Sequence, residues 1–129
     1  MEEVAMRARH QPGAIDTARA RSPRPDAVRL AHCKTFAEFY PLYLAEHSNA
    51  TCRRLHFAGS TLALLCLFFL VFTGNVWLLA MAAFCGYAFA WAGHYFFEHN
   101  RPATFTRPFY SLMGDWMMWW QLLSGRLAC

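Results

Sequence analysis

Charge is absent from the middle of this chain. Residues 55–97 contain no Asp, Glu, Lys or Arg, and the apolar fraction of the 129-residue sequence is 57%. Soluble globular domains average roughly 45–50% apolar residues, and a chain this short has little core volume in which to bury such an excess. The uncharged segment therefore predicts a membrane-embedded protein. The alternative is a soluble helical core, whose apolar runs are similar but seldom occur as two adjacent stretches of spanning length.

Patterns that would indicate other classes of protein are also missing. The five cysteines are scattered, with no CxxC pair or other zinc-binding spacing, which indicates a reducing compartment and no disulfide framework. There are no HxxHH-like clusters, which excludes a membrane hydroxylase with two irons and limits the chain to one metal. The net charge of +4 is modest. Its position on the flanks of the apolar segment fits membrane orientation rather than nucleic-acid binding.

The composition divides the chain into a tail and one domain. Residues 1–33 are rich in Arg, Ala and Pro and contain few large apolar side chains, so we expect a disordered tail. Residues 34–129 are predicted to form a membrane-embedded domain. It begins with a capping box from Thr35 to Glu38, followed by an aromatic stripe at helical spacing. This short helix is expected to lie at the membrane surface or to pack on the segments that follow.

Two apolar stretches, at about 55–72 and 76–97, are each long enough to cross the hydrocarbon core. As helices they would measure roughly 27 and 33 Å. The short polar linker that contains Gly74 predicts a tight turn between them. Gly86 and Gly93, together with several alanines, would allow close contact between the two helices. The predicted fold class is an all-α membrane protein with a two-span antiparallel transmembrane hairpin.

The last stretch, at about 109–123, is dense in Trp and Met and carries Asp115 in its middle. Trp at this density is typical of the membrane interface, so we expect an interfacial amphipathic helix there. The basic residues of the domain lie on the side of the two termini, and the turn carries none: Lys34, Arg53, Arg54, Arg101, Arg107 and Arg126. The positive-inside rule then places both termini in the cytosol, in a bacterial inner membrane or, in a eukaryote, the endoplasmic reticulum.

Hairpin geometry brings histidines from distant parts of the sequence to one level. His56 lies 18 residues before Gly74 and His94 lies 20 after it, which corresponds to depths of roughly 27 and 30 Å from the turn. His47 precedes the first span closely enough to fold over the same rim, and Glu98 shares a helical face with His94. Such a set of nitrogen and oxygen ligands predicts a site for one transition metal. Fe(II) that activates oxygen fits these ligands, and zinc would fit them too.

The neighbouring polar residues have more than one interpretation each. Arginine side chains near the rim either set the topology or clamp a substrate carboxylate: Arg53, Arg54 and Arg101. Glu46 is either a ligand or a partner that orients His47. Asp115 is expected either to bond a histidine or to cap the last helix. His99 points about 100° away from Glu98 and is either a membrane anchor or a support for the site.

Several strings at these positions, taken together, resemble the Mpo-type family of small integral membrane proteins. They occupy residues 43–47, 53–59, 93–98, 100–105 and 111–116. The fungal member of this family is a 2-hydroxy fatty acid dioxygenase of the endoplasmic reticulum, and it uses Fe(II) and oxygen to shorten the acid by one carbon. The resemblance covers about residues 35–127 and corresponds to a short form with two clear spans.

The resemblance implies roles for the matching residues. His47, His56 and His94 would be the iron ligands. Glu98, Asn100 and Arg101 match the motif that follows the last of these histidines, and that motif has no assigned role. The expected activity is then an iron-dependent dioxygenase that takes a 2-hydroxy fatty acid and molecular oxygen.

Two other functions are compatible with the sequence. One is a non-catalytic membrane hairpin that scaffolds other proteins or senses lipids. The other is a zinc-dependent lipid hydrolase, in which only metal-bound water could attack, because no Ser or Cys nucleophile occupies a recognisable setting. Whichever holds, a two-span chain of this size is expected to form a homodimer if a second copy is needed to complete the pocket.

Overall fold

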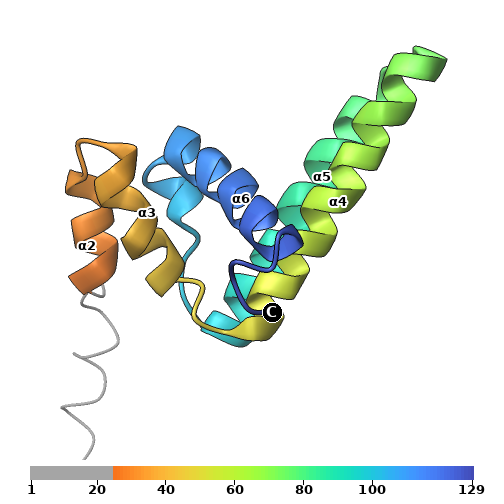
Figure 1. The fold of residues 1–129 in the computed structure, drawn as a ribbon. Helices are drawn as coiled ribbons and strands as arrows, with labels where there is room; N and C mark the ends of the chain where they lie inside the picture. The colour runs from red at the N-terminus through yellow and green to blue at the C-terminus, as the bar shows by residue number, and fades with distance from the viewer. Residues whose placement is uncertain (1–24) are drawn as a thin grey trace, which may run out of the picture.

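The computed structural model describes residues 25–129, and this part of the chain is helical without any strand (Figure 1). The elements, in order, are α2 (Pro25–His32), α3 (Phe36–Ala45), α4 (Ala50–Thr73), α5 (Trp77–Gly93), the π-helical turn η1 (His94–Glu98), the short 3-10 turn η2 (Ala103–Phe105) and α6 (Pro108–Leu123). The prediction of an all-α fold is confirmed.

Helices α4 and α5 form a long antiparallel hairpin that projects from the rest of the molecule (Figure 1). Gly74 ends α4 in the left-handed conformation, with φ of 66°, and its amide donates to the carbonyl of Leu70 at 2.8 Å. Glycine adopts this conformation without the steric cost that a side chain brings. Asn75 then accepts a hydrogen bond from the amide of Trp77, which opens α5. The predicted turn is therefore present where the polar linker was recognised.

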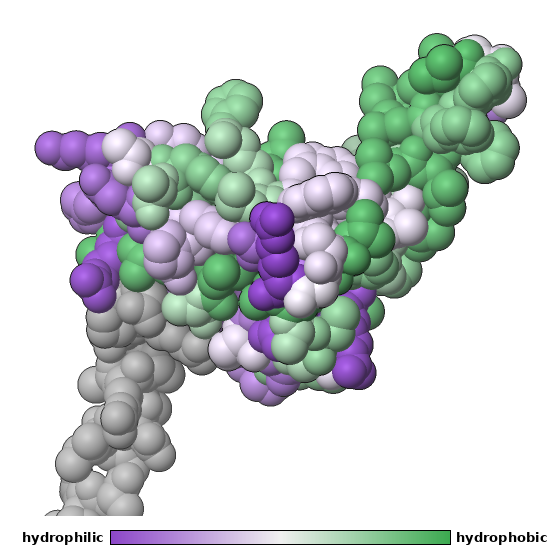
Figure 2. Space-filling model, viewed as in Figure 1, coloured by the Kyte–Doolittle hydropathy of each residue, from purple (hydrophilic) through white to green (hydrophobic). Residues whose placement is uncertain are grey.

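The projecting part of the hairpin exposes large apolar side chains. Val71, Phe72, Val76 and Trp77 at its end are each more than 70% exposed, and Figure 2 shows this end almost entirely hydrophobic. Among the described residues, α4 is the one helix whose length and composition suffice to cross a membrane. Helix α5 is shorter because its regular turns end at Gly93, where η1 continues it.

The two helices of the hairpin are in close contact at Gly59. A Cβ atom there would lie 2.7 Å from the Cβ of Phe89 and 2.9 Å from the carbonyl oxygen of Cys85. Gly93 makes a similar contact, since a Cβ would lie 2.9 Å from Cys52 Sγ. Gly86, which the sequence suggested for this purpose, has no atom within 4 Å of such a Cβ. Gly59 and Gly93 therefore allow close contact between the helices, whereas Gly86 leaves open space beside α5.

Helices α2, α3 and α6 pack beside the base of the hairpin around a small core (Figure 1). The buried residues of this core are Leu30, Cys33, Phe39, Tyr43, Ala103, Met118 and Leu122. Helix α3 begins as predicted, because the Thr35 hydroxyl accepts the amide of Glu38 at 3.3 Å. Helix α6 buries Met118 and Leu122 in this core. Its exposed residues are mostly apolar as well, so the helix lacks the polar face that an amphipathic helix would have: Phe109, Leu112, Met113, Met117, Trp120 and Leu123.

The predicted boundary of the tail at residue 33 differs from the structure. Residues 25–32 form α2, and Leu30 and Cys33 are buried against the aromatic side chains of α3. The Arg107 guanidinium also donates to the carbonyl of Ala31 at 2.7 Å. Composition misled the prediction here, because two apolar residues at helical spacing are enough to dock a short helix on an existing core. Residues 1–24 lie outside the described part of the chain.

Candidate metal centre

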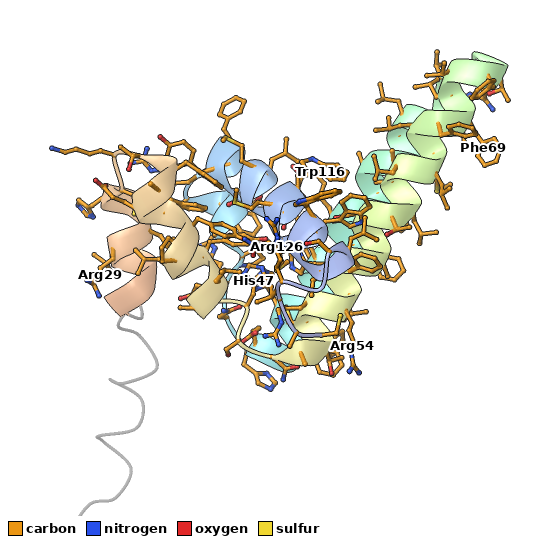
Figure 3. All side chains as sticks on the ribbon, in the orientation of Figure 1. Arg29, His47, Arg54, Phe69, Trp116 and Arg126 are labelled. Carbon is orange, nitrogen blue, oxygen red and sulfur yellow. The ribbon has the colours of Figure 1, made fainter. Side chains whose placement is uncertain are left out.

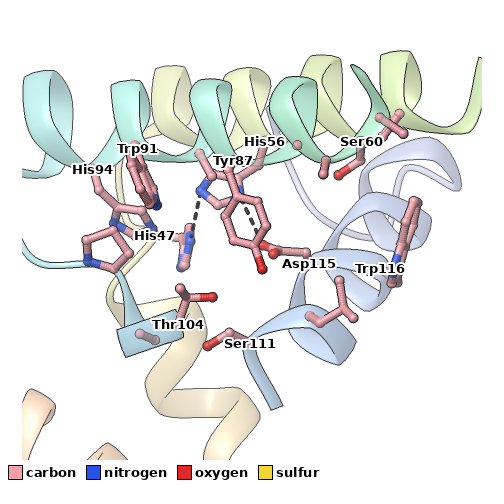
Figure 4. Close-up of a pocket in the computed structure, with 18 of the residues that line it drawn as sticks. His47, His56, Ser60, Tyr87, Trp91, His94, Thr104, Ser111, Asp115 and Trp116 are labelled. Atoms are coloured by element: carbon pink, nitrogen blue, oxygen red, sulfur yellow. Dashed lines mark hydrogen bonds and ion pairs between the residues drawn. The ribbon is translucent and has the colours of Figure 1, made fainter. Parts of the chain in front are cut away.

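Three histidines from three segments meet at the base of the hairpin (Figure 4). His47 follows α3, His56 lies in the second turn of α4, and His94 opens η1. They are only 1, 5 and 2% exposed. The Nε2 atoms of His47 and His56 are 3.2 Å apart. The ring centroids of His94 lie 4.5 and 5.2 Å from those of the other two. The structure therefore brings together the histidines that the helical rise along the hairpin predicted to lie at one level.

Each of these rings has an oxygen acceptor behind it. The Nδ1 atoms of His47, His56 and His94 lie 2.7 Å from the carbonyl of Tyr43, 2.9 Å from Asp115 Oδ1 and 2.6 Å from Asn100 Oδ1, respectively. An oxygen acceptor at this distance requires the proton on Nδ1. In a neutral imidazole, Nε2 then has no proton, and its lone pair can bind a metal. The hydrogen-bond network thus fixes one tautomer for all three rings.

This arrangement suits a cation. Burial, followed by the neighbouring imidazoles of His56 and His94, lowers the pKa of His47 well below its usual value, so that ring remains neutral at neutral pH. Neutral imidazoles with their lone pairs converging at 3.2 Å repel one another unless a positive ion lies between them. Metal-bound histidines characteristically donate their other nitrogen to an oxygen acceptor, as here. The donor set therefore fits a transition metal.

Asp115 connects the cluster to α6 and α3. Its Oδ1 atom accepts hydrogen bonds from His56 Nδ1 and from the hydroxyl of Tyr43. Burial raises the pKa of Tyr43 well above its usual value, and the neighbouring carboxylate raises it further, so the phenol keeps its proton and donates. Gly114 makes room for this contact, since a Cβ there would lie 3.1 Å from the Tyr43 ring. Asp115 was expected either to bond a histidine or to cap the last helix, and in the structure it bonds His56.

A cavity of about 280 Å³ extends from the histidines along the hairpin. One wall is α4 and α5, and the opposite wall is η2 and the first turns of α6 (Figure 4). The side chains along the hairpin are mostly small or apolar: Ala63, Leu67, Leu79, Ala82, Ala83 and Ala90. Tyr87, Trp91 and Trp116 line it with aromatic rings. A narrow apolar cavity with a polar group at one end suits a ligand with a hydrocarbon chain.

Comparison with known proteins agrees with this chemistry. A family model described as "2-hydroxy-palmitic acid dioxygenase Mpo1-like" matches residues 33–127. The chain belongs to the Mpo1-like family. The match contains all three histidines and the whole cavity, and it confirms the resemblance seen in the sequence motifs. No curated protein and no solved structure matches the chain.

Asn100 and Glu46 form an outer layer of this Mpo1-like site. The amide nitrogen of Asn100 donates to Glu46 Oε2 at 2.6 Å and to the carbonyl of the same residue at 3.0 Å. These bonds orient the Asn100 side chain so that its oxygen faces His94. Glu46 is buried, at 6% exposed. The structure therefore connects it to the cluster through Asn100 and His94, whereas the sequence suggested His47 as its partner.

Glu98 does not face the histidines, although the spacing from His94 predicted a shared helical face. Glu98 is the last residue of the π-helical turn η1. Glu98 accepts instead from the Ser48 hydroxyl at 3.2 Å and from the amide of Asn49. It thereby fixes the loop between His47 and α4. His99 is exposed, with φ of 51°, and lies outside the cluster.

The three arginines expected near a substrate carboxylate do not line the cavity. Arg53 Nη1 donates to the carbonyls of His47 and Ser48 at 2.9 and 2.6 Å, so it supports the main chain of the histidine loop. Arg54 is exposed. Arg101 is exposed as well and lies over the ring of Phe105, at 4.8 Å. The sequence spacing therefore predicted that these arginines lie near the rim, but it did not predict the direction of their side chains.

Sequence reasoning missed Cys52 as a neighbour of the cluster. Its sulfur and one ring nitrogen from each of the three histidines all lie within 4.8 Å of one another, and the residue is fully buried. The signal was available, because Cys52 precedes His56 by four residues and so shares its helical face. The search for zinc-type cysteine pairs overlooked it, since a single cysteine has no such spacing.

Proposed function

We propose that this protein is an iron-dependent membrane dioxygenase that acts on 2-hydroxy fatty acids. The observation that carries the proposal is the convergence of three buried histidines at one end of an apolar cavity, each with its Nδ1 hydrogen-bonded to an oxygen acceptor. Bound Fe(II) would supply the activation of oxygen. Three histidine ligands would leave coordination positions for oxygen and for the substrate, as in other iron sites with few protein ligands. The family description names the same substrate class.

The residues of the chain position such a substrate. The acyl chain would lie between α4 and the first part of α6, where Ala63, Leu67 and Ala82 line the cavity. Its carboxylate and 2-hydroxyl would then reach the histidine end. The apolar lining keeps water away from the reacting carbons, and the fixed histidine rings hold the C1–C2 bond in one orientation. All three histidines and the cavity come from one chain, so a homodimer stays a separate prediction.

Activity with purified components tests the proposal. The protein would be purified anaerobically in detergent, loaded with Fe(II) and given 2-hydroxypalmitate and oxygen. We expect iron-dependent oxygen uptake and a product one carbon shorter, detected by mass spectrometry. Palmitate, which lacks the 2-hydroxyl, is the matched control and should not be consumed. Protein that binds no metal after reconstitution would favour the scaffold instead. Protein that binds zinc and hydrolyses lipids without oxygen uptake would favour the hydrolase.

We also propose that α4 and the continuous segment formed by α5 and η1 both cross the membrane. The support is the exposed apolar surface of the hairpin and the absence of charge from residues 55–97. Both termini would then be cytosolic and Gly74 would lie on the opposite side. Reporter fusions and cysteine labelling at Cys129 and at an engineered cysteine beside Gly74 measure this. Labelling of both positions from the same side of the membrane would rule out two spans.

A further inference from the structure

A second and more open hollow lies at the rim of the hairpin, where α5 continues into η1 and the loop that follows. We call it the rim hollow. Exposed aromatic side chains form much of its wall: Trp91, Tyr95, Phe96 and Phe105, which are 48, 73, 64 and 53% exposed. The rings of Trp91 and Phe105 stack, with their centroids 5.9 Å apart. The hollow therefore offers a hydrocarbon chain a wall of aromatic rings.

Arg101 supplies a positive charge to the rim hollow. The residue is exposed, and its guanidinium carbon lies 4.8 Å from the centroid of the Phe105 ring. Among the described residues that line the hollow, none is acidic. A guanidinium matches a carboxylate in shape and can bond both of its oxygens. The rim hollow thus combines a cation for an acidic head with an apolar wall for the chain behind it.

The rim hollow adjoins the cavity at its histidine end. Trp91 and Pro102 line both spaces, and Figure 4 shows Trp91 and His94 at the same end of the cavity. Asn100, whose side-chain oxygen bonds His94, also lines the rim hollow. Under the topology proposed above, Arg101 follows the second span closely and lies at the level of the lipid head groups. The carboxylate of an acid dissolved in the membrane occupies the same level.

We propose that the rim hollow is a second binding site for long-chain carboxylic acids, in which Arg101 pairs with the carboxylate and the aromatic rings contact the start of the chain. This inference deepens the proposed function and rests on it, because the ligand class comes from the cavity. The other candidate occupant is an anionic phospholipid, whose phosphate also attracts an arginine. The shared walls at Trp91 and Pro102 favour the free acid, since one ligand class then fits both adjoining spaces.

Photolabelling locates the carboxylate end of a bound acid. The full-length protein in detergent is irradiated anaerobically with a palmitic acid analogue that carries a diazirine next to its carboxyl group, and mass spectrometry identifies the labelled residues. We expect labels within residues 95–105 of the wild type. Arg101→Gln should reduce this labelling by about 3- to 10-fold, the range of a partly exposed ion pair that includes a guanidinium. Arg101→Lys keeps the charge and should recover most of the labelling.

The matched control is Arg54→Gln, which removes the same charge from an exposed arginine that lines neither space, and its labelling should equal that of wild type. Unlabelled palmitate should compete for the site. Hexadecanol, which has the same chain without the charge, should compete far less. Equal labelling of Arg101→Gln and wild type would overturn the site, as would equal competition by hexadecanol and palmitate. Stronger competition by phosphatidylglycerol than by palmitate would assign the hollow to a phospholipid instead.

The labelling needs neither iron nor oxygen, so it separates this site from the proposed activity. Labelling that depends on Arg101, together with no oxygen uptake by the iron-loaded protein, rejects the dioxygenase alone. Oxygen uptake with 2-hydroxypalmitate, together with labelling that does not depend on Arg101, rejects the rim hollow alone.

Discussion

Replacement of any one of His47, His56 and His94 by Ala is expected to abolish stable metal binding. One ring nitrogen from each histidine lies within 4.8 Å of the others, and two remaining imidazoles would not fill the coordination shell. The loss in affinity should exceed the roughly 10–100-fold that follows from removing an outer partner of a metal ligand. Iron per protein, measured after anaerobic purification and reconstitution, gives the result for each variant.

His32→Ala is the matched control for these variants. His32 is exposed on α2, and its ring bonds the carbonyl of Val28 at 2.8 Å, away from the cluster. The control should retain the iron content of wild type. Far-UV circular dichroism in detergent shows whether each variant keeps its helices. Iron retained by a folded His56→Ala or His94→Ala protein would refute the ligand assignment, while the activity test of the wild type would still stand on its own.

Asp115→Ala is expected to lower metal affinity by about 10–100-fold. The substitution removes the acceptor for His56 Nδ1 and for the Tyr43 hydroxyl. His56 can then carry its proton on either nitrogen, and the ring loses its fixed orientation. Competition with a metal-buffering chelator measures the affinity directly, using Co(II) as a spectroscopic probe that tolerates oxygen better than Fe(II).

Two further variants separate the roles of the Asp115 carboxylate. Asp115→Asn keeps one acceptor oxygen and should lose less affinity than Asp115→Ala. Tyr43→Phe removes the hydroxyl but leaves the bond from Asp115 to His56, so its metal affinity should stay closest to wild type. A Tyr43→Phe loss as large as that of Asp115→Ala would mean that the phenol, rather than the carboxylate, orients the histidine.

Helix positions and depth along the hairpin could be predicted from the sequence, because they depend on local rules. The uncharged stretch marked the hairpin, Gly74 marked its turn, and the Thr35 cap marked the start of α3. A rise of about 1.5 Å per residue then gave the common level of His56 and His94. These features need only the spacing of residues along one chain. The stretch dense in Trp and Met also indicated α6.

The directions of side chains were decided by the tertiary structure. Glu98 bonds the loop after His47 rather than the histidines. Arg53 bonds main-chain carbonyls of that loop instead of a substrate. The acceptors behind the histidine rings come from Tyr43, Asn100 and Asp115, which are far apart in sequence.

The division has a physical reason. Periodicity fixes how far along a helix a residue lies, because the backbone hydrogen bonds set the rise and the turn. Which face meets a neighbouring helix depends on packing between segments that are remote in the sequence. Gly59, for example, and not Gly86, brings α4 against α5, and the space left at Gly86 belongs to the cavity. The sequence by itself determined an apolar helical hairpin with three histidines at one end. Only the packing of α6 on that hairpin created the cavity and attached Asp115 to His56.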